Sequence, residues 1–94
     1  MQEIVENLKK KYSKYLRISQ LALEKAKKNI VKNKNSALAL LDMAERYIKD
    51  AEFFWEHGKY VEAIAAVAYA HGWIDAASKL RLIKVKDDSL FVLP

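Results

Sequence analysis

Residues 51–77 have the sequence AEFFWEHGKYVEAIAAVAYAHGWIDAA, and this stretch decides the fold class. Its first part continues a helical apolar pattern, and Gly58 follows at the position where a left-handed C-terminal helix cap favours glycine. From Tyr60 onward, alanine and other apolar residues follow one another with few charges between them. A helix this apolar must be covered on more than one side. The stretch therefore predicts two long helices joined by a tight turn at Gly58.

The chain on either side of this stretch completes a pattern of three helices. Apolar residues recur at spacings of three and four over about residues 2–31, over 37–57 and over 60–82. The segment 32–35 interrupts this periodicity, and Asn35 or Ser36 is expected to cap the second helix. We therefore expect one all-α domain spanning residues 1–94, folded as an up-down-up three-helix bundle.

The last twelve residues, 83–94, change character and form a short extended tail. Asp87-Asp88-Ser89 is typical of a turn, and residues 90–93 form an uncharged run with a preference for extended backbone. Such a run would promote aggregation if it were unpacked, so we expect it to pack against another part of the structure or against a partner. Either it folds back over the bundle, or it adds to a partner or to a second copy.

Composition excludes several classes of protein. The 94 residues include two glycines, one proline and no cysteine, so disulfides, thiolate zinc sites and cysteine nucleophiles are excluded. The first 25 residues carry charged groups throughout, which argues against a signal peptide. The longest uncharged run, 63–74, is shorter than the roughly 20 residues that a membrane span needs. We expect a cytoplasmic protein without a membrane partner.

Positive charge is concentrated in the first helix and the loop after it. Residues 1–35 carry ten Lys or Arg against three Glu, a net charge of +7, whereas residues 36–94 carry a net charge of −2. Six of the cations lie in a row opposite the apolar stripe: Lys10, Lys14, Arg17, Lys25, Lys28 and Lys32. Such a row could follow a phosphate backbone, although that face offers no aromatic side chain for stacking bases. It could also face an acidic protein or a membrane surface, or be a solvated face that keeps the protein in solution.

Two histidines are candidates for chemistry. His57 lies at the end of the second helix, where a cation is favoured by the helix dipole. His71 lies one helical turn before Asp75, a spacing that lets a carboxylate orient an imidazole for base catalysis or for metal binding. A nucleophile or further ligands would be needed for a hydrolase or a metal site, and the spacing reveals none. The alternative is a hydrogen-bonded polar pair at the border of the core.

Some apolar side chains point away from the predicted core. Leu21 and Phe53 do so on the first and second helices and are candidates for a partner surface. On the third helix and the tail, Gly72, Trp73, Asp75 and Phe91 are candidates for helix packing or an interface. No pattern indicates a cofactor, a metal or a small-molecule substrate.

The segments 51–63 and 68–76 resemble a known family. A Gly-x-Tyr-x-x-Ala turn at Gly58 is followed by Tyr69-Ala70-His71-Gly72-Trp73-Ile74-Asp75-Ala76, which is similar to archaeal domain-of-unknown-function family 357. That resemblance implies a three-helix bundle and an archaeal source, and it implies no activity.

A weaker resemblance is to HEPN helical domains, which share the Gly-x-Tyr-x-x-Ala turn. Their ribonuclease members carry an arginine four to six residues before a histidine, and neither His57 nor His71 has one. We therefore do not expect that activity.

These observations favour a non-enzymatic helical interaction module that acts as a homo-oligomer or binds another protein. The second hypothesis is nucleic-acid binding by the basic row. The third is a hydrolase or a metal site at His71 and Asp75.

Overall fold

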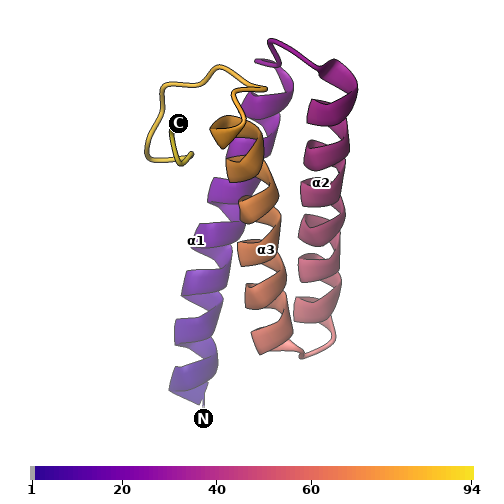
Figure 1. Cartoon of the computed structure of the whole chain (residues 1–94). Helices are drawn as coiled ribbons and strands as arrows, with labels where there is room; N and C mark the ends of the chain where they lie inside the picture. The colour runs from indigo at the N-terminus through magenta and orange to yellow at the C-terminus, as the bar shows by residue number, and fades with distance from the viewer. Residues whose placement is uncertain (1) are drawn as a thin grey trace.

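The computed structural model describes residues 2–94 and is a three-helix bundle (Figure 1). The helices are α1 (Gln2–Lys27), α2 (Lys34–Glu56) and α3 (Tyr60–Lys79). They run up, down and up, so that α1 and α3 are parallel and α2 is antiparallel to both. The predicted fold class is confirmed.

The turn between α2 and α3 forms as the sequence predicts. Gly58 has a left-handed φ of 75°. Its N–H donates to Trp55 O (3.1 Å), and the N–H of Lys59 donates to Phe54 O (2.8 Å). These two bonds define a Schellman cap, which satisfies carbonyls that the end of a helix would leave free.

Helix α1 ends at Lys27, four residues earlier than the periodicity predicts. The residues that follow pair instead with the chain beyond α3. Val31 N–H donates to Leu82 O and Lys84 N–H donates to Asn29 O, both at 2.9 Å, on either side of an isolated antiparallel bridge between Ile30 and Ile83. These backbone groups therefore hydrogen-bond with residues beyond α3 instead of continuing α1.

The start of α2 also differs from the prediction. The helix begins at Lys34, and its N-cap is Asn33 in a left-handed conformation (φ 47°) rather than Asn35 or Ser36, which lie in the first turn. Asparagine tolerates this conformation better than most residues, so the short connection closes without glycine.

Helix α3 ends at Lys79 instead of Leu82. Arg81 takes the left-handed position (φ 60°), and the N–H of Leu82 donates to Ala77 O (3.0 Å) in a second Schellman cap. Leu82 and Ile83 then turn into the core, where both are buried. Burial of these two apolar side chains is the reason that the helix stops here.

Alanine dominates the core. Nine of the buried core residues are alanines contributed by all three helices: Ala22, Ala26, Ala37, Ala44, Ala51, Ala63, Ala66, Ala70 and Ala77. Small side chains at the contacts let helix axes approach closely. The larger side chains that fill the remaining core include Leu41, Val67 and Ile74.

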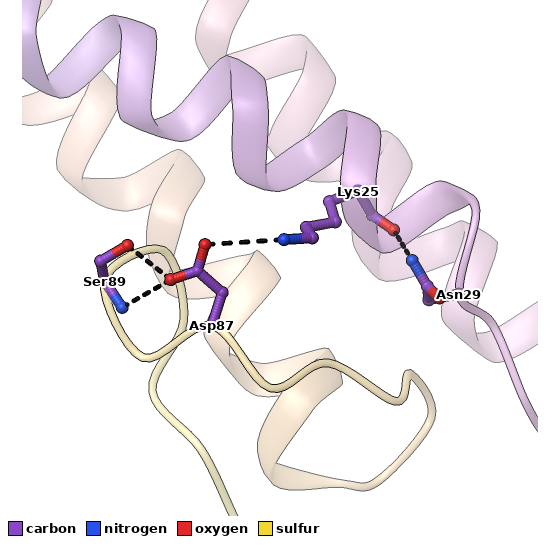
Figure 2. Close-up of polar contacts among 4 residues, drawn as sticks. All are labelled: Lys25, Asn29, Asp87 and Ser89. Carbon is purple, nitrogen blue, oxygen red and sulfur yellow. Dashed lines mark hydrogen bonds and ion pairs between the residues drawn. The ribbon is translucent and has the colours of Figure 1, made fainter.

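The tail folds back over its own bundle, which was one of the two expectations (Figure 1). Phe91 is only 4% exposed and packs in the same cluster as Ile74 and Ile83. The expected turn forms at Asp87, whose carboxylate accepts hydrogen bonds from the N–H and hydroxyl of Ser89. The same carboxylate pairs with Lys25 of α1 (3.5 Å), which ties the tail to the bundle (Figure 2).

Candidate interaction surfaces

The outer face of α3 consists mainly of small and apolar residues, with Glu62 exposed beside it in the first turn and Ala76 half-buried at its far end. It runs from Val61 through Ala65, Tyr69 and Gly72 to Ala76, and Val61 is 71% exposed. At 1.5 Å per residue this face is roughly 22 Å long. Helices α1 and α2 pack against the other sides of α3, and the tail lies beside its C-terminal end (Figure 1). The apolar character that the sequence indicated is therefore only partly accounted for within the chain.

Gly72 lies in the middle of this face, and its own chain does not require glycine there. A Cβ built at Gly72 would have no neighbouring side chain within 4 Å in the described part of the chain. Glycine inside a helix is about 1 kcal/mol less favourable than alanine. The fold of the single chain therefore gives no reason for this glycine.

Small side chains leave a shallow hollow around Gly72. It is lined by Ala65, Ala68, Tyr69, Gly72 and Trp73. The ring of Tyr69 packs against Trp73 on one side (centroids 6.1 Å apart) and against Tyr47 of α2 on the other (4.6 Å). The hollow thus has a floor of alanine and glycine and an aromatic rim toward α2.

A groove lies next to this hollow, between α3 and α1, and Ala68 borders both. Its volume is about 380 Å³, and its walls are almost entirely apolar. Helix α1 contributes Tyr12, Tyr15, Ile18 and Ser19, helix α3 contributes Ile64, Val67, Ala68 and His71, and the tail contributes Ser89.

Tyr12 forms the buried end of this groove. Its ring stacks on Trp55 with centroids 4.4 Å apart and planes 5° from parallel. Burial, followed by the negative charges of Glu52 and Glu56, raises the pKa of the Tyr12 hydroxyl above its ordinary value of 10.0.

Tyr15 differs from what the sequence pattern indicated. Tyr15 is one of the residues that recur at spacings of three and four over residues 2–31, so the pattern predicts a buried side chain. Instead its side chain is 50% exposed at the edge of the groove. The Lys14 ammonium lies 5.8 Å from the centre of the Tyr15 ring. One cation of the basic row therefore has an aromatic neighbour, which lies on the side of α1 that borders the groove.

A partly buried polar chain closes the opposite end of the groove. Ser19 Oγ lies 3.1 Å from His71 Nδ1 and donates to it when the ring proton is on Nε2. His71 Nε2 lies 3.6 Å from Asp75 Oδ1, and that oxygen accepts the N–H of Val92 at 3.0 Å. The chain joins α1, α3 and the tail.

This arrangement contains the serine that the spacing of His71 and Asp75 could not reveal. Ser19 is only 1% exposed, and its hydroxyl is hydrogen-bonded to His71. The contacts are those of a structural link between elements. A hydroxyl inside the apolar stripe of α1 was the signal in the sequence, because a buried hydroxyl needs a hydrogen-bond partner.

The basic row divides into two parts. Lys10, Lys14 and Arg17 are exposed, and none of them lies in an ion pair among residues 2–94. Lys25 pairs with Asp87, Lys28 pairs with Glu24 (3.3 Å), and Lys32 lies in the loop after α1. Figure 2 shows Lys25 directed toward Asp87 while its carbonyl accepts a bond from the Asn29 amide (2.7 Å).

The remaining candidate residues do not form one surface. Leu21 is exposed on the outer side of α1, and Phe53 is exposed on the outer side of α2, where its ring stacks on His57. The His57 Nδ1–H donates to Phe53 O (2.8 Å), which fixes this pair at the end of α2.

Within α3 and the tail, Gly72 is exposed, whereas Trp73 is partly buried and packs against the core. Asp75 accepts a hydrogen bond from the N–H of Val92 in the tail, and Phe91 is buried against its own bundle.

The part of the chain that the structure describes lacks a membrane span and a metal-binding cluster. Within residues 2–94, no helix combines the length and the apolar character needed to cross a bilayer. In the same range, no group of three or more histidine, aspartate or glutamate side chains is arranged to hold a metal ion.

Comparison with known proteins gives one match. No curated protein and no solved structure matches the chain, and the weaker resemblance to HEPN domains is not shown. A family model does match residues 14–83, which include the second half of α1 and the whole of α2 and α3. The chain therefore belongs to the family described as protein of unknown function (DUF357).

Proposed function

We propose that this protein is a helical interaction module that forms a homodimer through the outer face of α3. The observation that carries the proposal is Gly72, an exposed glycine in mid-helix for which its own chain gives no reason. A second helix packed closely against the face would give one, because only a residue without a side chain allows the shortest approach between backbones.

A second copy is the partner that this face fits best. A two-fold axis places the same patch of two subunits against itself, so the patch must complement itself. Small residues such as Ala65, Gly72 and Ala76 meet this requirement, because they carry no charge that would meet its own copy. The hollow beside Tyr69 and Trp73 offers space for a helix of the partner.

The size of the face indicates a modest affinity. One helix face roughly 22 Å long is too small for a standard interface of about 800 Å² per partner. The contact must therefore extend toward α2 over Tyr69 and Tyr47, whose rings pack together beside the hollow. An interface at the low end of the size range predicts a dimer that dissociates on dilution.

The test compares two substitutions to leucine by sedimentation velocity over a wide range of protein concentration. Gly72→Leu fills the hollow and should abolish the dimer. Ala39→Leu adds a similar side chain on an exposed site of α2 and should leave the dimer intact. Gly72→Ala should raise the stability of the dilute monomer by about 1 kcal/mol, because the added methyl group meets open space.

Two outcomes would reject the proposal. The wild-type chain could remain monomeric at the highest concentration tested, or Gly72→Leu could associate as well as the wild type. Thermal melts of dilute Gly72→Leu separate a blocked interface from a misfolded chain, since the monomer should be at least as stable as the wild type.

A further inference from the structure

The first half of α1 concentrates cations that the fold leaves unpaired. Five of them occupy three turns, all exposed and none in an ion pair among residues 2–94: Lys9, Lys10, Lys11, Lys14 and Arg17. By contrast, Lys25, Lys27 and Lys28 farther along α1 each pair with a carboxylate. Unpaired cations this close together repel one another, and an anionic ligand would remove that repulsion.

This part of α1 is also the least enclosed. No residue of α1 before Tyr12 is buried within the described part of the chain. The start of α1 lies at the same end of the bundle as the turn between α2 and α3, away from the tail (Figure 1). A long ligand can therefore approach these cations without displacing any part of the protein.

An exposed aromatic ring lies next to one of these cations, on the side of α1 that borders the groove. Half of Tyr15 is exposed, and its ring lies next to the Lys14 ammonium at the edge of the groove between α1 and α3. Cations that follow a backbone, combined with an aromatic ring on which bases stack, are the pair of features that binds single-stranded nucleic acid. A duplex would use the cations but not the ring, because its bases are already stacked.

The groove beside Tyr15 suits a base rather than a polar ligand. Its walls next to Tyr15 are apolar, and they include Ile18 of α1 and Ile64 of α3. The polar pair at its far end, Ser19 and His71, is already hydrogen-bonded within the protein. Few groups remain to distinguish one base from another, so little sequence preference is expected.

We propose that the first half of α1 binds single-stranded nucleic acid. Lys10, Lys14 and Arg17 contact successive phosphates, while one base stacks on Tyr15 and covers the groove. This proposal does not depend on the dimer, because its cations and Tyr15 lie on α1 and Gly72 does not line the groove, although Ala68 borders both surfaces.

The experiment measures fluorescence anisotropy of labelled oligouridine, oligoadenosine and a duplex of equal length over a range of salt concentrations. Single strands should bind more tightly than the duplex. With three to five phosphate contacts, the logarithm of the binding constant should fall with the logarithm of salt with a slope of roughly −2 to −3.5. The monomeric Gly72→Leu variant should bind as well per chain as the wild type.

Two sets of variants separate this site from general attraction to a basic protein. Combined Lys10→Gln, Lys14→Gln and Arg17→Gln should make the slope less steep by about 2. Combined Lys34→Gln, Lys49→Gln and Lys84→Gln removes the same charge from exposed sites elsewhere and should change binding little. Tyr15→Leu should weaken binding by roughly tenfold, whereas Tyr15→Phe should restore it because it keeps the stacking surface.

Three results would overturn the proposal. Equal losses in the two triple variants would mean attraction by net charge alone. Stacking would be excluded if the duplex bound with the same affinity as the single strands and if Tyr15→Leu left this affinity unchanged. Capture by anionic phospholipid vesicles without binding of any oligonucleotide would assign the cations to a membrane surface.

Discussion

At the scale of single residues, two side chains place a hydroxyl group on the buried, apolar side of α1. Ser19 and Tyr12 both lie on the buried side of α1, and each is held by one specific neighbour, His71 and Trp55 respectively. A buried hydroxyl is tolerated when it is hydrogen-bonded or stays neutral. Their positions therefore influence how stability responds to substitution and to pH.

Tyr12 should make the fold sensitive to alkali. Because burial raises the pKa of its hydroxyl, the folded state holds this proton more tightly than the unfolded state does. The contribution to stability is fully present below pH 10, the ordinary tyrosine value, and is lost as pH rises toward the raised pKa. Thermal melts should show the wild type losing more stability above pH 10 than Tyr12→Phe, which keeps the stack on Trp55. Equal losses in both proteins would contradict this account.

At the scale of elements, α2 and α3 end in the same motif with different residues at its critical position. Both ends have the hydrogen-bond pattern of a Schellman cap, with Gly58 at the left-handed position after α2 and Arg81 after α3. A residue with a Cβ is strained in this conformation, whereas glycine is not.

Substitution of the residue in the left-handed position should change stability in opposite directions at the two caps. Arg81→Gly should stabilise the protein by about 1 kcal/mol, which raises the Tm by roughly 4–8 °C. Gly58→Ala should destabilise it by a similar amount, although no neighbouring atom would touch the added methyl group. Chemical denaturation of both variants measures the two changes in the free energy of unfolding. A loss of stability in Arg81→Gly would show that the guanidinium contributes more than the strain removes.

At the scale of the whole molecule, closure of the tail depends on the turn at Asp87. Hydrogen bonds from the Ser89 side chain and backbone, together with the charge of Lys25, lower the pKa of this carboxyl below its ordinary value of 3.8. The stabilisation is therefore present above pH 3.8 and is lost as pH falls through the lowered pKa.

Asp87→Asn should loosen the tail at neutral pH. We expect faster hydrogen exchange of the amides of residues 90–93 and a lower Tm than in the wild type, and this difference should shrink in acid below pH 3.8. Asp88→Asn alters the exposed neighbouring carboxylate and is the matched control. A variant whose tail amides exchange at the wild-type rate would show that Phe91 and its apolar neighbours hold the tail without the turn.

The sequence alone determined those features that depend on neighbours along the chain. The three helices follow from apolar residues spaced by three and four, and the turn at Gly58 follows from a backbone conformation that favours glycine. The basic character of α1 and the uncharged stretch of α3 were visible for the same reason, since composition and helical period do not depend on the rest of the fold.

Only the tertiary structure decided those features that depend on residues far apart in the chain. Pairing of residues 29–31 with residues 82–84 ended α1 early, and the hydrogen bond between Ser19 and His71 joined positions 52 residues apart. Folding of the tail buried Phe91 and gave Asp75 a hydrogen bond from Val92, whereas Gly72 remained exposed. No local pattern encodes these outcomes, because which face of a helix is covered depends on how all the elements pack together.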